Sequence, residues 1–319
     1  MNKTEYKTIL NSRFFEINFI LFPIWITFFY FFAKSLLPFS DEIIFFIFLF
    51  ILGESHFAST YLFYFDKSNH KWIKNNSYKM LVIPIMLASI YVIIGFNHLY
   101  LALLIGAVMS AIHVTRQSIG IQRLYTTGRN VFFEYNTYFF SFLFIGIGFF
   151  RFYYNEIINK FNLPLPYYDE NYNKFFIFIL LIGLIIALLE KTNYKKILTN
   201  LTGVLIYSPY LFVNNIFDAI IIGVGAHWCQ YVAINYKVYF YEMHLSKSNL
   251  KSIFLIFVII YALCMSLLGY KTHFIENFNN LLLLIPLTGQ FLHYYIDAFI
   301  WKFSDEHIRN NIGSKLFLK

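Results

Sequence analysis

The sequence predicts an all-α integral membrane protein, a single polytopic domain over residues 1–319 with about ten transmembrane helices. Hydrophobic residues make up 59% of the chain and charged residues only 13%, whereas soluble domains carry about 25% charged residues. The mean hydropathy is +0.58. Apolar runs approaching the roughly 20 residues that cross a bilayer recur along the whole chain. This composition excludes an ordinary soluble domain.

Ten apolar segments follow one another with short connections. The first follows a basic N-terminus, and its apolar part is too long for a signal-peptide core, so we interpret it as a retained span. The seventh is the weakest, because Pro209 interrupts it and Asn214 and Asn215 close it. The predicted spans lie near residues 14–37, 42–65, 79–96, 98–124, 131–151, 174–190, 197–213, 215–237, 250–270 and 280–302.

The basic residues predict the orientation. With the N-terminus inside, four fifths of the lysine and arginine residues fall in segments on the cytoplasmic side, which favours ten spans with both termini cytoplasmic. We therefore expect a multi-pass protein of the bacterial inner (cytoplasmic) membrane. The net charge of +8 then reflects loop topology, and the expected partners are the lipid bilayer and a lipophilic small molecule, with no nucleic acid. Cys229 and Cys264 both lie in apolar runs, so no disulfide framework is expected.

Four of the nine histidines lie inside predicted spans and at matching depth. His56, His113 and His227 each precede a charged residue by ten positions, and His293 precedes one by nine. At 1.5 Å per residue, ten residues cover about 15 Å, half of a roughly 30 Å hydrocarbon core. All four spans are even-numbered and run in the same direction. The four imidazoles are therefore predicted to share one level near the midplane, where ionisable groups usually face the bundle interior.

Each of these histidines is followed, one helical turn later, by a hydrogen-bonding side chain. Residues three and four apart share a helix face, and metal-binding histidines usually donate their second ring N–H to such a partner. The pattern predicts that Asp297, Gln117 and Gln230 hold the ligands in place, and that Arg116 or Tyr231 stabilises bound oxygen or an anionic substrate group. Direct ligation by Asp297, or its pairing with Lys302 or Arg116, are the alternatives. The neighbours are Ser59 and Thr60 after His56, Arg116 and Gln117 after His113, Gln230 and Tyr231 after His227, and Asp297 after His293.

The predicted ligand set is four neutral imidazoles around one metal ion. Imidazole suits iron, zinc, copper and nickel, and Fe(II) with open coordination positions could bind oxygen. A zinc site would instead indicate hydrolysis by an activated water, and a single haem with two axial histidines is a further alternative. The zinc-protease motif HExxH, the P-loop and the dinucleotide-binding glycine turn are absent from the sequence.

The motifs SHFAS, IHVTRQSIG and AHWCQYVAI, which contain His56, His113 and His227, resemble those of the bacterial Brp/Blh-type membrane carotenoid dioxygenases. The resemblance implies an all-helical fold, membrane-buried histidines that hold a nonhaem iron, and an apolar polyene substrate, β-carotene, cleaved to retinal. The chain departs from that family because no second histidine follows His227 one turn later, so His293 would supply the fourth ligand. This departure favours an iron oxygenase acting on a carotenoid-like or lipid-like substrate.

A transporter or channel is the alternative function. Glu54 lies two residues before His56 on a different helix face, and with Arg116, Asp297 and the buried histidines it could form an ion or proton relay. Transporters of this kind contain helices broken near the midplane, for which the segment around Pro209 is the candidate. Bound iron would distinguish the oxygenase from a metal-free protein with pH-dependent flux.

Overall fold

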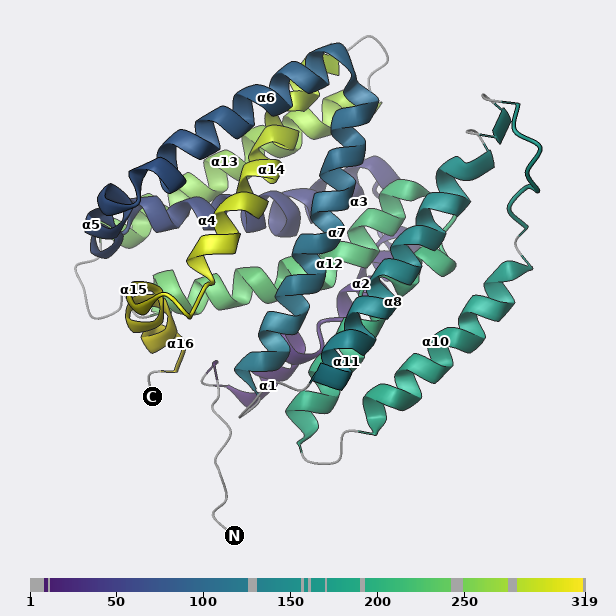
Figure 1. Cartoon of the computed structure of the whole chain (residues 1–319), viewed down its shortest axis with the longest axis horizontal. Coiled ribbons are helices and arrows are strands. Elements are labelled where there is room, and N and C mark those ends of the chain that lie inside the picture. Colours follow the sequence, from purple (N-terminus) through teal and green to yellow (C-terminus); the bar gives the residue numbers. More distant parts are fainter. Residues whose placement is uncertain are drawn as a thin grey trace. The chain divides into compact units, whose positions relative to one another are not determined.

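A computed structural model describes residues 9–10, 12–125, 131–155, 158–159, 162–169, 171–189, 193–241, 249–274 and 280–317. The secondary structure of these residues is helical and includes no strand, which confirms the predicted all-α class. Figure 1 labels the helices in chain order.

The number of helices that meet the criteria of a membrane span is smaller than predicted. Among the described residues, five helices are long and apolar enough, or up to six if one bent pair counts as a single span, where the sequence predicts ten. The five are Asp41–Phe65, Tyr78–Asn97, Leu101–Leu124, Val131–Phe152 and Ser252–Gly269. Several long apolar helices fit a membrane protein.

Breaks in helices and short helices account for four of the five predicted spans that do not meet these criteria. The first predicted span bends by 82° between Arg13–Leu21 and Trp25–Leu36, around Pro23. The helix expected at 197–213 runs instead over Tyr194–Leu205 and is followed by a 3₁₀ turn that contains Pro209. A proline cannot donate the backbone hydrogen bond that would continue the helix. The helices at 174–190 and 280–302 have only 17 residues each, shorter than a straight crossing needs.

The described chain divides into two compact units. The first contains Ser12–Leu37 and Ala111–Gln230, and the second contains Pro38–Ser110 and Tyr231–Lys319. The long helices α7 (Leu99–Leu124) and α12 (Ile216–Asn235) each contribute residues to both units. The sequence-based assignment of one domain to residues 1–319 stays a prediction.

The first unit is built from α-helices, π-helical turns and one 3₁₀ turn, besides its parts of α7 and α12. These elements are α1 (Arg13–Glu16), η1 (Ile17–Leu21), α2 (Trp25–Leu36), α8 (Val131–Phe149), η4 (Phe150–Tyr154), α10 (Tyr172–Leu188), α11 (Tyr194–Leu205) and η5 (Ser208–Leu211).

Helix α11 packs against α8 and α10 in the first unit, and small and polar residues allow the close approach. A Cβ at Gly203 would lie 2.7 Å from the Thr137 hydroxyl oxygen and 2.8 Å from the Gln122 amide nitrogen. Gln122 donates to Thr137 at 2.7 Å, so this junction is both tight and hydrogen-bonded. A buried ion pair joins α11 to α1, because Lys195 Nζ lies 3.6 Å from Glu16 Oε2.

The second unit contains the remaining helices and the ends of the two shared ones. These elements are α3 (Asp41–Phe48), η2 (Leu49–Glu54), α4 (Ser55–Phe65), α5 (Lys67–Asn75), η3 (Tyr78–Val82), α6 (Ile83–Asn97), η6 (Tyr236–Tyr241), α13 (Asn249–Phe274), η8 (Asn280–Leu283), α14 (Leu284–Ile300), α15 (Glu306–Ile308), η9 (Arg309–Gly313) and α16 (Ser314–Phe317).

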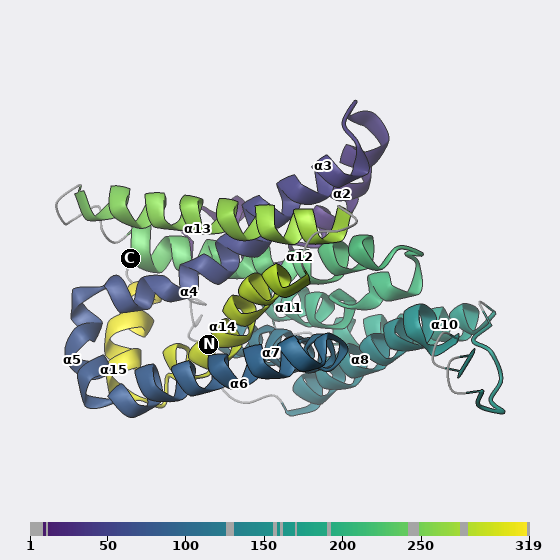
Figure 2. The ribbon, with the colours of Figure 1, turned by 90° about the horizontal axis from the view of Figure 1, so that it is seen from above.

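Helix α14 packs against α4, α6 and α13 in the second unit, and α13 runs beside α4 (Figure 2). Two glycines permit these approaches, since a Cβ at Gly95 would collide with Leu284 and one at Gly289 with the Tyr261 hydroxyl group. Tyr61 on α4 donates to the carbonyl of Gly289 at 2.8 Å. The packing fixes α4 relative to α14, and these two helices carry His56 and His293.

Candidate metal centre

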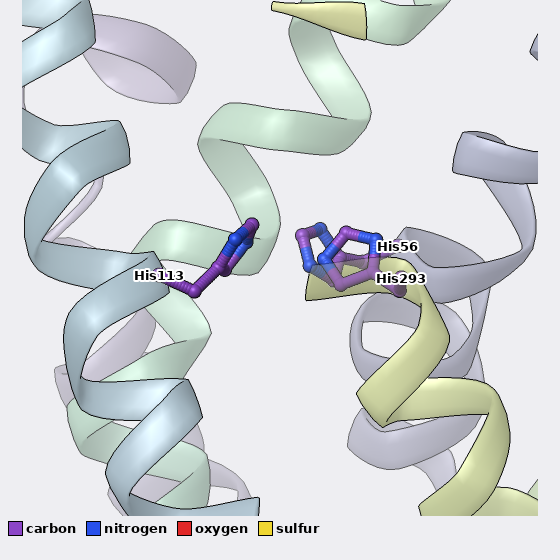
Figure 3. Close-up of side chains that lie close together, drawn as sticks. All are labelled: His56, His113 and His293. Carbon is purple, nitrogen blue, oxygen red and sulfur yellow. The ribbon is translucent and has the colours of Figure 1, made fainter. Parts of the chain in front are cut away.

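The second unit contains a closely spaced pair of buried histidines, His56 on α4 and His293 on α14. Each side chain is inaccessible to solvent, with 0% relative exposure. Their ring centroids are 4.4 Å apart at an interplanar angle of 71° (Figure 3). A nitrogen of one ring lies within 4.8 Å of a nitrogen of the other. Two nitrogens bound at about 2.1 Å to one ion are at most about 4.2 Å apart, so a small adjustment would let both rings bind a single metal.

A π-helical turn sets the position of His56. The turn η2 covers Leu49–Glu54 inside the predicted span and ends one residue before α4 begins at Ser55. Ser55 Oγ donates to the carbonyl of Phe50 at 2.9 Å, which satisfies a backbone acceptor inside the wider turn. Single π-helical turns within α-helices are frequent at functional sites. Here the turn determines which face of α4 carries His56.

The Thr60 hydroxyl group connects His293 to Asp297. Thr60 Oγ1 lies 2.6 Å from His293 Nδ1 and donates to Asp297 Oδ1 at 2.9 Å. The direct distance from His293 Nδ1 to Asp297 Oδ1 is 3.6 Å, too long for a good hydrogen bond. The carboxylate therefore acts on the imidazole through the hydroxyl group, one helix away from both.

This arrangement determines the tautomer of His293. Thr60 has one hydroxyl proton, which it donates to Asp297. The contact between Thr60 Oγ1 and His293 Nδ1 is then a hydrogen bond only if Nδ1 carries the proton and donates. The lone pair of the neutral imidazole consequently lies on Nε2, the nitrogen that would bind a metal. A carboxylate acting on a histidine in this way fixes the ring orientation and raises its basicity as a ligand.

Tyr231 and Trp301 complete the hydrogen bonds around Asp297. The Tyr231 hydroxyl group lies 2.7 Å from Asp297 Oδ1 and 2.5 Å from Thr60 Oγ1, and Trp301 Nε1 donates to Tyr231 at 3.3 Å. The Tyr231 ring also contacts the His56 ring, with centroids 4.3 Å apart. The Tyr231 ring also lies beside the His293 ring, with centroids 5.4 Å apart, so Tyr231 contacts both histidines of the pair and bonds to Asp297 as well.

The other two predicted ligands pair with each other in the first unit. His113 on α7 and His227 on α12 have ring centroids 5.2 Å apart and nearly perpendicular rings, at 88°. His227 is 1% exposed and His113 is half-buried. Neutral imidazole is the form in which histidine binds metals.

The remaining predicted residues lie in three different environments. Gln230 is buried and donates from Nε2 to the carbonyl of Ile20 at 2.6 Å, so it joins α12 to η1. The Oε1 atom of Gln117 is buried and has no hydrogen-bond partner among the described residues. Arg116 lies on an exposed face of α7. Gln230 therefore joins two elements of the first unit, whereas Asp297 is linked to His293 through Thr60, and the roles predicted for both residues stay predictions.

The sequence pattern missed part of this network. Thr60 stands out in the sequence as a neighbour of His56, but in the structure it bonds to His293 and Asp297, more than 230 positions away along the chain. No local signal connects such distant residues. Trp301 lies four residues after Asp297, and this helical spacing could have indicated its role.

The fold and the site define an all-helical protein with long apolar helices and two pairs of neighbouring histidines, one pair supported by a carboxylate. No family model, no curated protein and no solved structure matches the chain.

Proposed function

We propose that the protein is a membrane-embedded nonhaem-iron oxygenase, a dioxygenase in its reaction type, that acts on a lipophilic substrate. His56, His113, His227 and His293 are the proposed ligands of one Fe(II). The observation that carries the proposal is the buried pair of His56 and His293, of which the second is held by Thr60 and Asp297 with Nε2 as its lone-pair nitrogen. A structural histidine needs one hydrogen-bond partner, whereas a carboxylate-supported pair is typical of a metal site.

Helix α12 carries both His227 and Tyr231. His227 precedes Tyr231 by four residues on this helix, and residues four apart share a face. Tyr231 contacts the ring of His56.

The side chains of the site suit oxygen chemistry on an apolar molecule. Neutral imidazoles bind Fe(II) and leave coordination positions open, and the bound ion would supply oxygen activation. Phe57 contacts both histidines of the second unit, with ring centroids 5.0 Å from His56 and 5.2 Å from His293. Phe57 is itself buried and places apolar surface against these two rings, while Thr60 and Asp297 hold His293 by hydrogen bonds. Tyr231 and Arg116 are the proposed groups that stabilise bound oxygen or a polar group of the substrate.

The membrane topology and the substrate class belong to the same proposal. Ten apolar segments with both termini cytoplasmic, in a bacterial inner membrane, are supported by the distribution of lysine and arginine residues. The resemblance of the histidine motifs to the Brp/Blh-type dioxygenases supports a carotenoid-like or lipid-like substrate.

Metal analysis of the purified protein tests the proposal. The protein is expected to contain about one iron per chain, and His56→Ala, His113→Ala, His227→Ala or His293→Ala each to abolish iron binding. His70→Ala is the matched control, because His70 is exposed and bonds only to the carbonyl of Tyr64 among its described contacts. Purified protein that folds but takes up no iron on anaerobic reconstitution would refute the proposal.

A relay for ions or protons is the second candidate, and one observation favours it. Glu54 is 5% exposed, and its Oε2 atom has no hydrogen-bond partner among the described residues. Buried carboxylates at this depth mark ion and proton pathways in membrane proteins. Metal-free protein that conducts protons in vesicles, with flux lost in Glu54→Gln, would support the relay over the oxygenase.

A further inference from the structure

Helix α5 connects two of the long apolar helices of the second unit. It covers Lys67–Asn75, between the helices Asp41–Phe65 and Tyr78–Asn97, and only one or two residues separate it from each. Asp66 caps its N-terminus by accepting from the backbone N–H of Ser68 at 3.0 Å. If the two apolar helices cross a bilayer, these short connections hold α5 at the membrane surface.

One face of α5 is a stripe of basic residues. Lys67, His70, Lys71 and Lys74 are all exposed, and their spacing of three, four and seven residues from Lys67 places them on a single helix face. Segment 67–79 has a further lysine at its end, Lys79, and contains no aspartate or glutamate. The stripe is therefore a concentrated positive surface about 10 Å long, at a rise of 1.5 Å per residue.

The opposite face of α5 is buried and fixed in place. Asn69 and Ile73 are buried, and the Trp72 ring stacks on His307 of α15 with centroids 5.7 Å apart. Asn69 Oδ1 also accepts from the Asn311 side chain at 2.7 Å. The C-terminal elements thus hold the inner face, so α5 cannot rotate its lysines inward.

The acidic group closest in sequence to the stripe is already occupied. Asp66 accepts from the Ser68 hydroxyl group at 2.7 Å and from Lys315 at 3.1 Å, and Lys315 lies on α16. Asp66 is therefore neutralised by a different lysine. The lysine side chains of the stripe remain exposed on the surface of the second unit.

We propose that the basic stripe of α5 (Lys67, His70, Lys71 and Lys74) binds the phosphate groups of anionic phospholipids. Lysine clusters next to a membrane-spanning helix attract anionic headgroups, at about 1 kcal/mol or roughly fivefold in affinity per lysine close to the surface. The stripe lies on a rigid helix whose ends enter two apolar helices, so its lysines meet headgroups at fixed positions. This binding surface is independent of the proposed iron site.

The test compares retained lipids in the full-length protein. Wild type and a Lys67→Gln/Lys71→Gln/Lys74→Gln variant are reconstituted into nanodiscs of equal phosphatidylglycerol and phosphatidylcholine content, and the lipids that remain bound after release are identified by native mass spectrometry. We expect wild type to retain phosphatidylglycerol preferentially, and the glutamine variant to lose this preference at least tenfold. The matched control, with arginine at the same three positions, should keep it.

Two further measurements distinguish the source of the phosphate and the effect of folding. Inorganic phosphate at 10 mM and constant ionic strength should leave the preference unchanged, whereas raising the salt concentration should weaken it by screening. Both variants should unfold at the wild-type temperature, because the substituted side chains are exposed. An unchanged lipid preference in the glutamine variant, or displacement of the lipid by free phosphate, would overturn the proposal.

Discussion

At the scale of single residues, Thr60 is the centre of the candidate site. Its hydroxyl group lies within hydrogen-bond distance of His293, Asp297 and Tyr231, and these residues come from two helices other than its own. Thr60 donates its one proton to Asp297 and can accept from His293 Nδ1, while Tyr231 donates to the same carboxylate oxygen. The orientation of His293 therefore depends on a residue that is not itself a ligand.

Replacing Thr60 tests this dependence. Thr60→Val keeps the shape of the side chain but leaves Asp297 and His293 without their shared partner, so we expect a loss of about 1–3 kcal/mol of stability. Iron affinity should fall by about 10–100-fold. Thermal unfolding and an iron-chelator competition assay measure the two effects. Thr60→Ser restores the hydroxyl group and should behave as wild type; equal defects in the serine and valine variants would argue against the hydrogen bonds.

The ion pair between Asp66 and Lys315 gives a pH-dependent prediction. Burial alone would raise the pKa of Asp66, but hydrogen bonds from Ser68 and the charge of Lys315 outweigh it and lower the pKa below its usual value. A carboxylate with a depressed folded-state pKa stabilises the fold above its unfolded-state pKa, and this contribution disappears as the pH falls through the folded-state pKa. The stabilisation is thus complete near neutral pH and is lost in acid.

We therefore expect Lys315→Gln to lower stability by about 0.5–1 kcal/mol at pH 7, because both side chains are partly exposed. The difference from wild type should shrink as the pH falls below about 4. Unfolding in detergent at a series of pH values measures it. Lys71→Gln, on the exposed stripe, is the control and should show no such pH-dependent difference. A constant deficit for Lys315→Gln at all pH values would contradict the ion-pair explanation.

At the scale of helices, close packing depends on the positions of glycine residues, which have no side chain. Helix α11 approaches α8 through Gly203, whose Cβ would collide with Thr137 and Gln122. A Cβ added at Gly120 on α7 would instead lie in open space, with no other atom within 4 Å. Two glycines in helices of one unit thus have opposite structural roles.

Alanine substitutions should separate these roles. Gly203→Ala adds a methyl group to a tight junction and is expected to destabilise the protein by about 1–3 kcal/mol. Gly120→Ala should be neutral or stabilise by up to about 1 kcal/mol, because alanine favours the helix more than glycine does. Thermal unfolding of both variants gives the comparison. If Gly203→Ala were as stable as wild type, the junction would be looser than the distances indicate.

The helices were the predictable part of the fold, and their interruptions were not. Long apolar runs predicted the helical segments, and the break at His98 between α6 and α7 falls at the expected short turn. Pro23 and Pro209 stand at real breaks, but a proline in the sequence does not reveal whether a helix bends or ends. The π-helical turns were not predicted from the sequence.

At the scale of the whole molecule, the pairing of the histidines was only partly predictable. Matching depth in the spans indicated four buried histidines, and the structure pairs His56 with His293 and His113 with His227. The partner of each histidine depends on the rotation of its helix about the helix axis and on which helices lie next to one another. A hydropathy pattern contains neither kind of information. The same limit applies to Thr60, because its partners are set by tertiary contacts.

Reporter fusions test the proposed topology of the entire chain. Because the basic residues concentrate on one side, a green fluorescent protein fused to either terminus should remain in the cytoplasm and fluoresce. Alkaline phosphatase inserted at 162–169, within the predicted outer connection between the spans 131–151 and 174–190, should be active. Loss of fluorescence at one terminus alone, with normal protein levels, would indicate an odd number of crossings.

The π-helical turn η2 affects how this sequence can change by insertion or deletion. A π-helical turn holds about one residue more than an α-helical turn, so removing one residue from Leu49–Glu54 would convert it to regular helix and leave His56 near its present angle. A deletion within the regular helix α4 has no such extra residue to lose, and it would turn everything that follows it by about 100°. A one-residue gap near Gly53 in an aligned homologue is therefore compatible with the same placement of His56, whereas a gap between Ser55 and Thr60 is not.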